Sequence, residues 1–315
     1  MNYAPVVLFC YNRPEHTYET LVALAKNIYA EQTDVYIFVD GIRDIANEKE
    51  SFSQKAVIKV VSEIEGFKSK TIYISEKNNG LAKSIITGVT KILSQYKSVI
   101  VLEDDIVSGK YFLEYMNTAL KKYADNKKVW HITGWHNPTK IENRTDSFFY
   151  PLMDCWSWAT WEDRWSFFEK NPEKLICSMS SEDIRKFNVD GLVPNKWAQV
   201  LGNYNGVNNT WAIFWYAAIM QHDGLCLAPA NSLVKNIGFD NTGVHSTSKE
   251  DYRILTDINH RISVYPKEFQ TNEIQYSIIK KDYRKRFRKE RVKAVVSKIL
   301  PNKVKNFIRK LRKNK

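Results

Sequence analysis

The sequence predicts an α/β fold in which a mostly parallel sheet is flanked by helices, with a basic helical tail at the C-terminal end. Short apolar runs alternate with helix-like segments in the N-terminal part, which is the pattern of βαβ units. The chain has 315 residues, of which 43% are hydrophobic, so it is long enough to bury both faces of such a sheet. Its net charge of +12 is concentrated at one end, which predicts a separate basic tail.

The apolar runs predict strands that are buried on both faces, because they lack the alternation of a half-exposed strand. These strands cover residues 6–10, 35–39, 71–74 and 98–102, and residues 15–30, 47–65 and 81–96 between them are predicted to be helical. Further along, we expect a helix at residues 110–123 and a short strand at residues 129–132. The tryptophan-rich segment 148–165 is expected to be helical after Asp154.

Polar side chains follow each predicted strand. Because the carboxyl ends of parallel strands meet at one edge of a sheet, these side chains are expected to share that edge, where such sheets bind ligands. The most specific group is Glu103, Asp104 and Asp105, since three successive carboxylates repel one another unless a cation neutralises them. Oxygen ligands suit Mn²⁺ or Mg²⁺, so a metal site is predicted here. The alternatives are a helix cap or a solvated turn.

Several motifs along residues 5–245 together resemble a known family. They are Phe9-Cys10-Tyr11-Asn12-Arg13-Pro14, Phe38-Val39-Asp40-Gly41, Asn78-Asn79-Gly80-Leu81, Val101-Leu102-Glu103-Asp104-Asp105, Ile132-Thr133-Gly134-Trp135, Cys155-Trp156-Ser157-Trp158-Ala159-Thr160-Trp161 and Leu233-Val234-Lys235-Asn236-Ile237-Gly238. With these motifs the chain resembles glycosyltransferases of the GT-A fold, whose sheet is Rossmann-like. It is similar to bacterial sugar transferases of surface-polysaccharide biosynthesis and, more distantly, to N-acetylglucosaminyltransferase I.

The resemblance implies a nucleotide-sugar donor and a divalent metal. Asp105 would ligate the metal, and His245 would complete the metal or pyrophosphate site, although a histidine in a polar loop often has no such role. The implied donor contacts are Arg13 to the diphosphate, Asp40 to the base, Asn78 and Gly80 beside the nucleotide, and Glu103 and Asp104 to the ribose or donor sugar.

The resemblance also implies an inverting transfer in which a carboxylate deprotonates the acceptor hydroxyl while the metal stabilises the leaving diphosphate. The family carries this base in a Trp-Asp-Asp-Trp segment, but the matching residues 211–215 contain no acid. Asp154 is the first substitute and Asp240 the second. Trp156 and Trp211 are candidates to stack on the acceptor sugar, with core packing as the alternative.

The predicted organisation is a GT-A domain at residues 1–265, with a nucleotide-sugar-binding half at 1–106 and an acceptor-binding half at 107–265, followed by a basic amphipathic tail at 266–315. Residues 280–315 contain 17 Lys and Arg and two acidic residues, so the rest of the chain, with 30 basic and 33 acidic residues, is slightly acidic. This body argues against nucleic-acid binding. The tail pattern is typical of two short interfacial helices around Pro301 on an anionic membrane, the alternative being a solvated tail.

We expect a protein of the cytoplasm, peripheral on the inner face of the membrane, with a saccharide or lipid-linked saccharide as acceptor. The N-terminus resembles a first strand and not a signal peptide, and no apolar run is long enough for a transmembrane helix. Two other functions remain open from the sequence. A nucleotidyltransferase would share the sheet and the metal but lacks its usual glycine-rich loop here, and a non-catalytic glycan- or membrane-binding module would leave the acidic triplet unexplained.

Overall fold

The computed structural model describes residues 3–136, 146–239 and 257–299, and the side chains of these up to residue 288. Asp240 and His245, two of the predicted site residues, lie outside the described residues.

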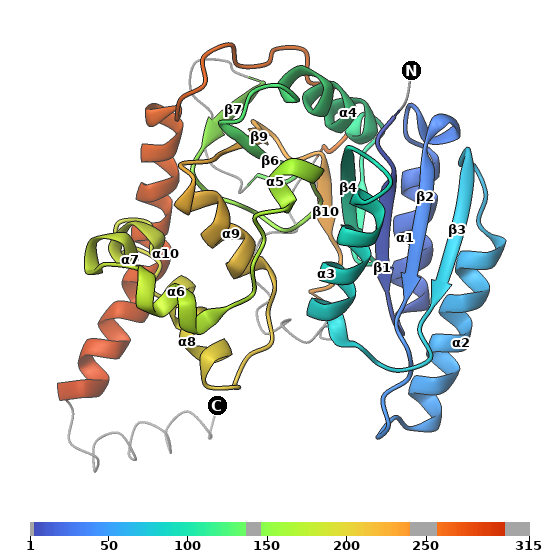
Figure 1. Cartoon of the computed structure of the whole chain (residues 1–315), viewed down its shortest axis with the longest axis horizontal. Helices are drawn as coiled ribbons and strands as arrows, with labels where there is room; N and C mark the ends of the chain where they lie inside the picture. Colours follow the sequence, from blue (N-terminus) through green and yellow to red (C-terminus); the bar gives the residue numbers. More distant parts are fainter. Residues whose placement is uncertain (1–2, 137–145, 240–256, 300–315) are drawn as a thin grey trace.

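One large sheet runs through the described part of the chain (Figure 1). Its eight strands have the order β3-β2-β1-β4-β8-β6-β9-β7; β7 and β8 are antiparallel to their neighbours and the others are parallel. This confirms the predicted α/β class with a mostly parallel sheet. The strands are β1 (Val6–Cys10), β2 (Asp34–Val39), β3 (Ser69–Ile74), β4 (Ser98–Glu103), β6 (Val129–Thr133), β7 (Ser147–Tyr150), β8 (Trp158–Trp161) and β9 (Leu225–Pro229). A second, two-stranded sheet pairs β5 (Ile106–Ser108) with β10 (Val234–Asn236).

The tryptophan-rich segment does not form the expected helix. Trp158–Trp161 is strand β8, which pairs with β4 on one side and with β6 on the other, and only the short helix α5 (Glu162–Trp165) follows it. All four residues of β8 are buried because the strand lies in the middle of the sheet. The two halves predicted on either side of residue 106 are thereby joined in one sheet.

Helices cover both faces of the sheet, and the side chains of β1 alternate between the two layers. Val6 and Leu8 contact the core beneath α1, α2 and α4, whereas Val7 and Phe9 contact the core beneath α3 and α9. The helices are α1 (Pro14–Ala25), α2 (Glu48–Glu63), α3 (Gly80–Leu93), α4 (Phe112–Tyr123), α6 (Pro172–Ser178), α7 (Ser181–Phe187), α8 (Asn195–Tyr204), α9 (Ala212–Gln221) and α10 (Glu273–Ile299), with the 3₁₀ turn η1 (Ala30–Gln32).

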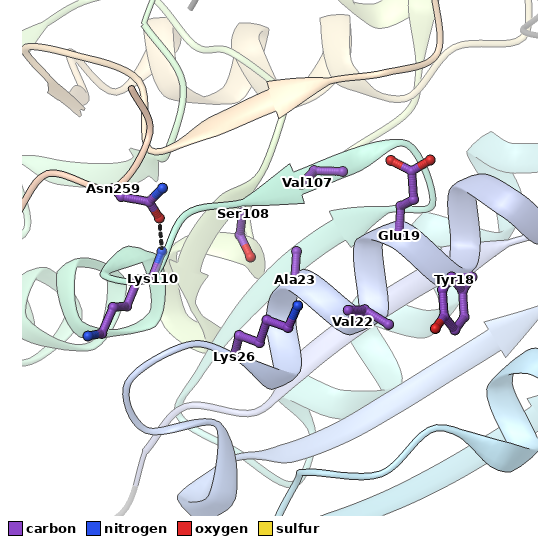
Figure 2. A pocket seen from close by; sticks show the side chains of 9 residues that line it. All are labelled: Tyr18, Glu19, Val22, Ala23, Lys26, Val107, Ser108, Lys110 and Asn259. Carbon is purple, nitrogen blue, oxygen red and sulfur yellow. Dashed lines mark hydrogen bonds between the residues drawn. The ribbon is translucent and has the colours of Figure 1, made fainter. Parts of the chain in front are cut away.

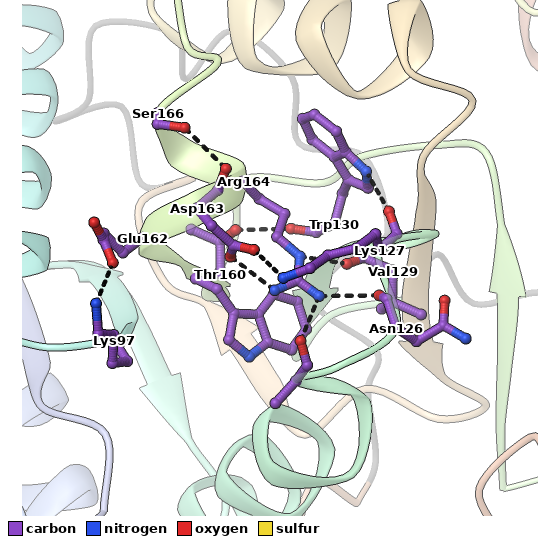
Figure 3. Close-up of polar contacts among 12 residues, drawn as sticks. Lys97, Asn126, Lys127, Val129, Trp130, Thr160, Glu162, Asp163, Arg164 and Ser166 are labelled. Atoms are coloured by element: carbon purple, nitrogen blue, oxygen red, sulfur yellow. Dashed lines mark hydrogen bonds and ion pairs between the residues drawn. The ribbon is translucent and has the colours of Figure 1, made fainter.

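A buried arginine ties the second half of the sheet to α4 (Figure 3). Arg164 is 3% exposed, and its guanidinium donates hydrogen bonds to the carbonyl oxygens of Ala124 at 2.7 Å and Asn126 at 2.9 Å, just beyond the C-terminus of α4. Its other contacts are an ion pair with Asp163 and the ring face of Trp161. Because the last carbonyls of a helix have no partner within it, this side chain serves as a C-terminal cap.

Helix α10 packs on the body, so the folded unit extends beyond the predicted boundary at residue 265. Gln275 and Ile279 are 1% and 2% exposed, and Tyr276, Tyr283 and Phe287 pack against the same core cluster. The helix runs unbroken to residue 299 as one element, where the sequence predicted a separate short helix before Pro301. Within the described residues, no helix is both long and apolar enough to cross a membrane.

Candidate functional site

The ends of β1, β2 and β4 lie side by side. Phe9 is in register with Glu103 and Cys10 with Val39, so the residues that follow these strands share one edge, as predicted. Pro14 occupies the first turn of α1, where its fixed φ suits a helix start, and Arg13 is therefore held at the N-cap position directly beside the end of β4.

Arg13 forms ion pairs with two members of the acidic triplet. Its Nη1 lies 2.9 Å from Oδ2 of Asp105, and its Nη2 and Nε contact the carboxylate of Asp104. The Arg13 side chain is 19% exposed and that of Asp104 is 5% exposed, so these pairs are sheltered from water. The hydroxyl of Thr20 in α1 donates to the backbone oxygen of Asp104 at 2.8 Å and anchors the turn.

The triplet carries more negative charge than Arg13 neutralises. Burial, together with the charges of Asp105 and Asp104, raises the pKa of Glu103 to about 8. Burial also raises the pKa of Asp104 to about 6, although Arg13 opposes this shift. The part of these shifts that comes from repulsion between neighbouring carboxylates is the part that an added cation would relieve.

The described residues fit a metal shared with a ligand better than a closed metal cage. Within residues 3–136, 146–239 and 257–299, no three His, Cys, Asp or Glu side chains converge on one point. Mg²⁺ and similar ions are often held by one or two carboxylates and by the phosphates of a substrate. The side chain of Asp105 is 13% exposed, so its carboxylate could provide such a ligand.

Asp40 joins two loops of the same edge. Its carboxylate accepts hydrogen bonds at 2.8 Å from the backbone N–H groups of Asn79 and Gly80, at the start of α3. The side-chain amide of Asn78 donates a hydrogen bond to the carbonyl oxygen of Gly41 at 2.7 Å. Gly80 has a φ of +71°, which favours glycine, and a Cβ on Gly41 would lie 2.4 Å from the backbone of Lys77. These hydrogen bonds hold the loop after β2 against the start of α3 and so fix the positions of Asp40, Asn78 and Gly80. Their contacts to a nucleotide stay a prediction.

Asp154 lies on the side of the site formed by the second half of the sheet. Its Oδ1 accepts a hydrogen bond from the backbone N–H of Trp156 at 3.0 Å, and its backbone oxygen lies 3.0 Å from Nε2 of the buried His131. Burial raises the pKa of Asp154 to about 7, and the positive charge of Lys196 in α8 partly opposes this. A carboxylate that titrates near neutral pH suits a general base.

Asp154 and Glu103, the first residue of the acidic triplet, both lie near Cys155. Burial raises the pKa of Cys155 well above its usual value, and the charges of both Asp154 and Glu103 add to this effect. Lys196 lies with its Nζ 3.9 Å from the ring centre of Tyr216, and burial lowers its pKa to about 8. Asp154 and Glu103 are therefore both close enough to Cys155 to influence its thiol.

The two tryptophans predicted to contact the acceptor differ in their positions. Trp156 is partly exposed and lies edge-on to Trp135 at 4.8 Å and to Phe239 at 5.4 Å between ring centres, beside the site. Trp211 is 4% exposed and stacks on Trp158 at 5.1 Å in the interior. The position of Trp211 therefore corresponds to the core alternative, whereas acceptor stacking by Trp156 stays a prediction.

Sequence reasoning assigned no role to Gly238, Trp135 or Lys196. A Cβ on Gly238 would lie 2.2 Å from Oδ2 of Asp105 and 3.1 Å from Nη1 of Arg13, so this glycine lets the chain after β10 approach the ion pair. Gly238 and Trp135 belong to the motifs that carried the resemblance, which was the available signal. No signal in the sequence pointed to Lys196, because α8 brings this residue close to Asp154 from a distant part of the sequence.

A groove of about 450 Å³ lies elsewhere, along α1 beside β5 (Figure 2). Lys110 donates its backbone N–H to the side chain of Asn259 there at 2.9 Å. None of the described residues predicted for the site lines this groove. It is therefore separate from the carboxyl edge of the sheet.

No family model matches the chain, and no curated protein matches its sequence. Solved structures similar to it include the mannosyltransferase PcManGT from Pyrobaculum calidifontis in complex with GDP-Man and Mn²⁺, with 12% identity and a TM-score of 0.39 over 69% of this chain and 70% of that one. Residues 1–349 of S. aureus TarS give 14% identity and a TM-score of 0.37 over 52% and 48%. A longer TarS structure gives 12% identity and a TM-score of 0.39 over 74% of this chain and 36% of that one. The chain thus spans about half or less of the length of the two TarS chains. At these identities and TM-scores, the function proposed below rests on the residues of the site.

Proposed function

We propose that the protein is a glycosyltransferase of the GT-A type, which transfers a sugar from a nucleotide-sugar donor with the help of Mn²⁺ or Mg²⁺. The observation that carries this proposal is the sheltered cluster of Glu103, Asp104 and Asp105 at the end of β4, paired with Arg13. An excess of carboxylates favours a metal ion, and the arginine favours a diphosphate. A metal ion bound there would supply a charge that stabilises the leaving diphosphate.

The acceptor side of the proposal rests on Asp154 and Trp156. Asp154 is held by a backbone N–H and titrates near neutral pH, as a base that removes the proton of an acceptor hydroxyl requires. Trp156 is the partly exposed aromatic side chain next to it, and an indole face suits the apolar face of a sugar ring. Transfer by direct attack of that hydroxyl would invert the configuration of the transferred sugar.

Calorimetry with a panel of UDP-, GDP- and dTDP-sugars, with and without Mn²⁺, tests the donor site. We expect one donor to bind in the presence of Mn²⁺ and to bind at least tenfold more weakly to the Asp105→Asn variant, which keeps the shape of the side chain but loses its charge. The control is Glu162→Gln, whose side chain is 47% exposed in the surface pair with Lys97. Equal affinity of wild type and Asp105→Asn, or no binding by any donor in the panel, would contradict the proposal.

We further propose that the acceptor is a saccharide or lipid-linked saccharide of surface-polysaccharide biosynthesis and that the enzyme works on the inner face of the cell membrane. Support comes from the charge distribution, because residues 289–315 carry 11 Lys and Arg against one Glu. Each such cation near an anionic membrane contributes about 1 kcal/mol of attraction. The apolar residues spaced between them are Val292, Val295, Val296, Ile299, Leu300, Val304, Phe307, Ile308 and Leu311.

A further inference from the structure

Several of the exposed large apolar side chains come from two segments of the chain, residues 45–52 and 201–207. Among the described residues, those with the greatest exposure are Ile45 at 88%, Val207 at 79% and Phe52 at 75%. Tyr204 and Leu201 add 55% and 40%. We call these five residues the apolar rim. Single exposed apolar residues are common on proteins, but a group of them gathered at one end marks an interaction surface.

The rim lies around the carboxyl edge of the sheet, where the candidate site is. In Figure 1 the strands β1 and β2 point toward the lower end of the molecule. The N-terminal end of α2, which carries Phe52, lies at that end, and so does α8, which carries Leu201 and Tyr204 (Figure 1). Two separate parts of the chain therefore place apolar side chains on either side of the same edge.

The part of the chain that carries Leu201, Tyr204 and Val207 has no charged residues of its own, and the cation of Lys170 contacts it at the side chain of Asn209. Residues 197–221 contain no Asp, Glu, Lys or Arg, although 26% of the chain is charged. Residues 204–209 of this stretch are exposed, and they comprise Tyr204, Val207, three asparagines and Gly206. A segment without charged side chains of its own can enter the boundary between lipid head groups and acyl chains at little desolvation cost, tyrosine prefers that boundary, and a lysine beside it suits anionic head groups.

The basic helix identifies the partner of this surface. The C-terminal end of α10 reaches the same lower end of the molecule (Figure 1), and the 11 Lys and Arg of residues 289–315 begin within its last turns. A cationic helix end and an apolar rim at the same end of the molecule are complementary to an anionic lipid surface, which offers negative head groups and an apolar interior together. A second copy of this chain would instead bring two cationic ends together, and this is unfavourable.

We propose that the apolar rim inserts into the lipid interface next to the basic tail, so that the carboxyl edge of the sheet faces the membrane. The inference rests on the membrane association proposed above. It adds a second, salt-resistant contact and a fixed orientation, in which an acceptor carried by a lipid reaches Asp154 without leaving the bilayer surface.

Vesicle sedimentation of the full chain tests the rim. Vesicles of phosphatidylcholine with and without phosphatidylserine are compared at low and high salt, because salt screens the tail but not apolar burial. The variants are Tyr204→Ser/Val207→Ser and Ile45→Ser/Phe52→Ser, which leave the net charge unchanged. The control is Val264→Ser/Ile274→Ser, whose side chains are 56% and 54% exposed. Ile274 lies in the first turn of α10 and the backbone oxygen of Val264 accepts a hydrogen bond from Ser147 at the start of β7, and these elements lie at the opposite end in Figure 1.

At high salt, we expect each rim variant to bind anionic vesicles about tenfold or more weakly than wild type. The control variant should bind them as strongly as wild type. The proposal would be overturned if both rim variants bound vesicles as strongly as wild type. It would also be overturned if a rim variant bound vesicles normally but changed from dimer to monomer, because the rim would then be a contact between copies of the chain. The tail is tested separately by truncation after Arg288. If truncation abolishes binding and the rim variants do not weaken it, the rim proposal fails while the proposed function stands.

A second measurement reports the insertion itself. Val207→Cys and Val264→Cys are labelled with an environment-sensitive dye in a Cys177→Ser background, because Cys177 is an exposed thiol. Anionic vesicles should shift the emission of the label at position 207 to shorter wavelength and leave that at position 264 unchanged. Equal shifts at both positions, or none at either, would contradict the orientation.

Discussion

The backbone at Gly238 lies against the carboxylate of Asp105, because a Cβ at this position would be 2.2 Å from Oδ2. Gly238→Ala should therefore push Asp105 away from Arg13 and weaken Mn²⁺-dependent donor binding about tenfold or more. Gly191→Ala is the control, since a Cβ there meets nothing within 4 Å and only the φ of +72° is unfavourable. Calorimetry with the donor found for wild type makes the comparison, and unchanged affinity in Gly238→Ala would show that the carboxylate adapts.

The activity should rise with pH as Asp154 loses its proton. Burial raises the pKa of this group to about 7, whereas an aspartate in the unfolded chain titrates near about 4. The folded state thus binds the proton more tightly, so this group stabilises the fold fully below about pH 4, and that contribution is lost as the pH rises through about 7. Asp154→Asn should lower kcat by about 10² or more and remove this pH dependence from the denaturation midpoint. Near-normal turnover would move the base elsewhere.

Lys196 should set the position of that pH profile. Its charge lowers the pKa of Asp154, so Lys196→Met should move the rising limb of kcat to higher pH, while Lys196→Arg should keep it near the wild-type position. A purely structural role would lower activity equally at every pH. The measurement is kcat against pH for the three proteins at saturating donor.

Arg164 should contribute more to stability than to activity. Arg164→Met leaves the carbonyls of Ala124 and Asn126 without their donor, and we expect the free energy of unfolding to fall by about 3 kcal/mol. Arg185→Met, in a surface pair with Glu182, should change it by less than about 1 kcal/mol. Urea denaturation of both variants measures the difference, and similar losses would mean that water replaces the cap.

The position of a tail truncation should decide whether the body remains stable. A chain that ends after Arg288 keeps Tyr283 and Phe287 on the core and should unfold near the wild-type temperature. A chain that ends before Lys280 loses both contacts and should unfold at a lower temperature. Equal melting temperatures would mean that the later turns of α10 add no stability to the body.

The parts of the fold set by local pattern were predictable. The first four parallel strands were found because they form uninterrupted apolar runs between helical segments, and the acidic edge followed from their topology. Strand β8 was missed because its four residues, two tryptophans with Ala159 and Thr160 between them, are buried on both faces, and no short-range signal shows that the strand pairs with β4.

The candidate site also contains residues that the sequence predicted and contacts that it did not. Arg13 and the acidic triplet were found together because each directly follows a strand of the same edge. The link from Asp40 to Gly80 and the approach of Lys196 to Asp154 depend on how loops and α8 pack, which no spacing in the sequence encodes. In α10, the high charge suggested a separate tail, but Ile279, Tyr283 and Phe287 recur at i, i+4 and i+8 and bind that face to the core.

The central place of β8 has a consequence for synthesis of the chain. Residues 98–103 emerge from the ribosome well before residues 158–161, so β4 has no partner on one side while more than fifty residues are added. An unpaired, apolar strand edge can pair with other chains. The N-terminal half is therefore most exposed to misassembly during this interval, and the arrival of β8 between β4 and β6 is the step that closes the sheet.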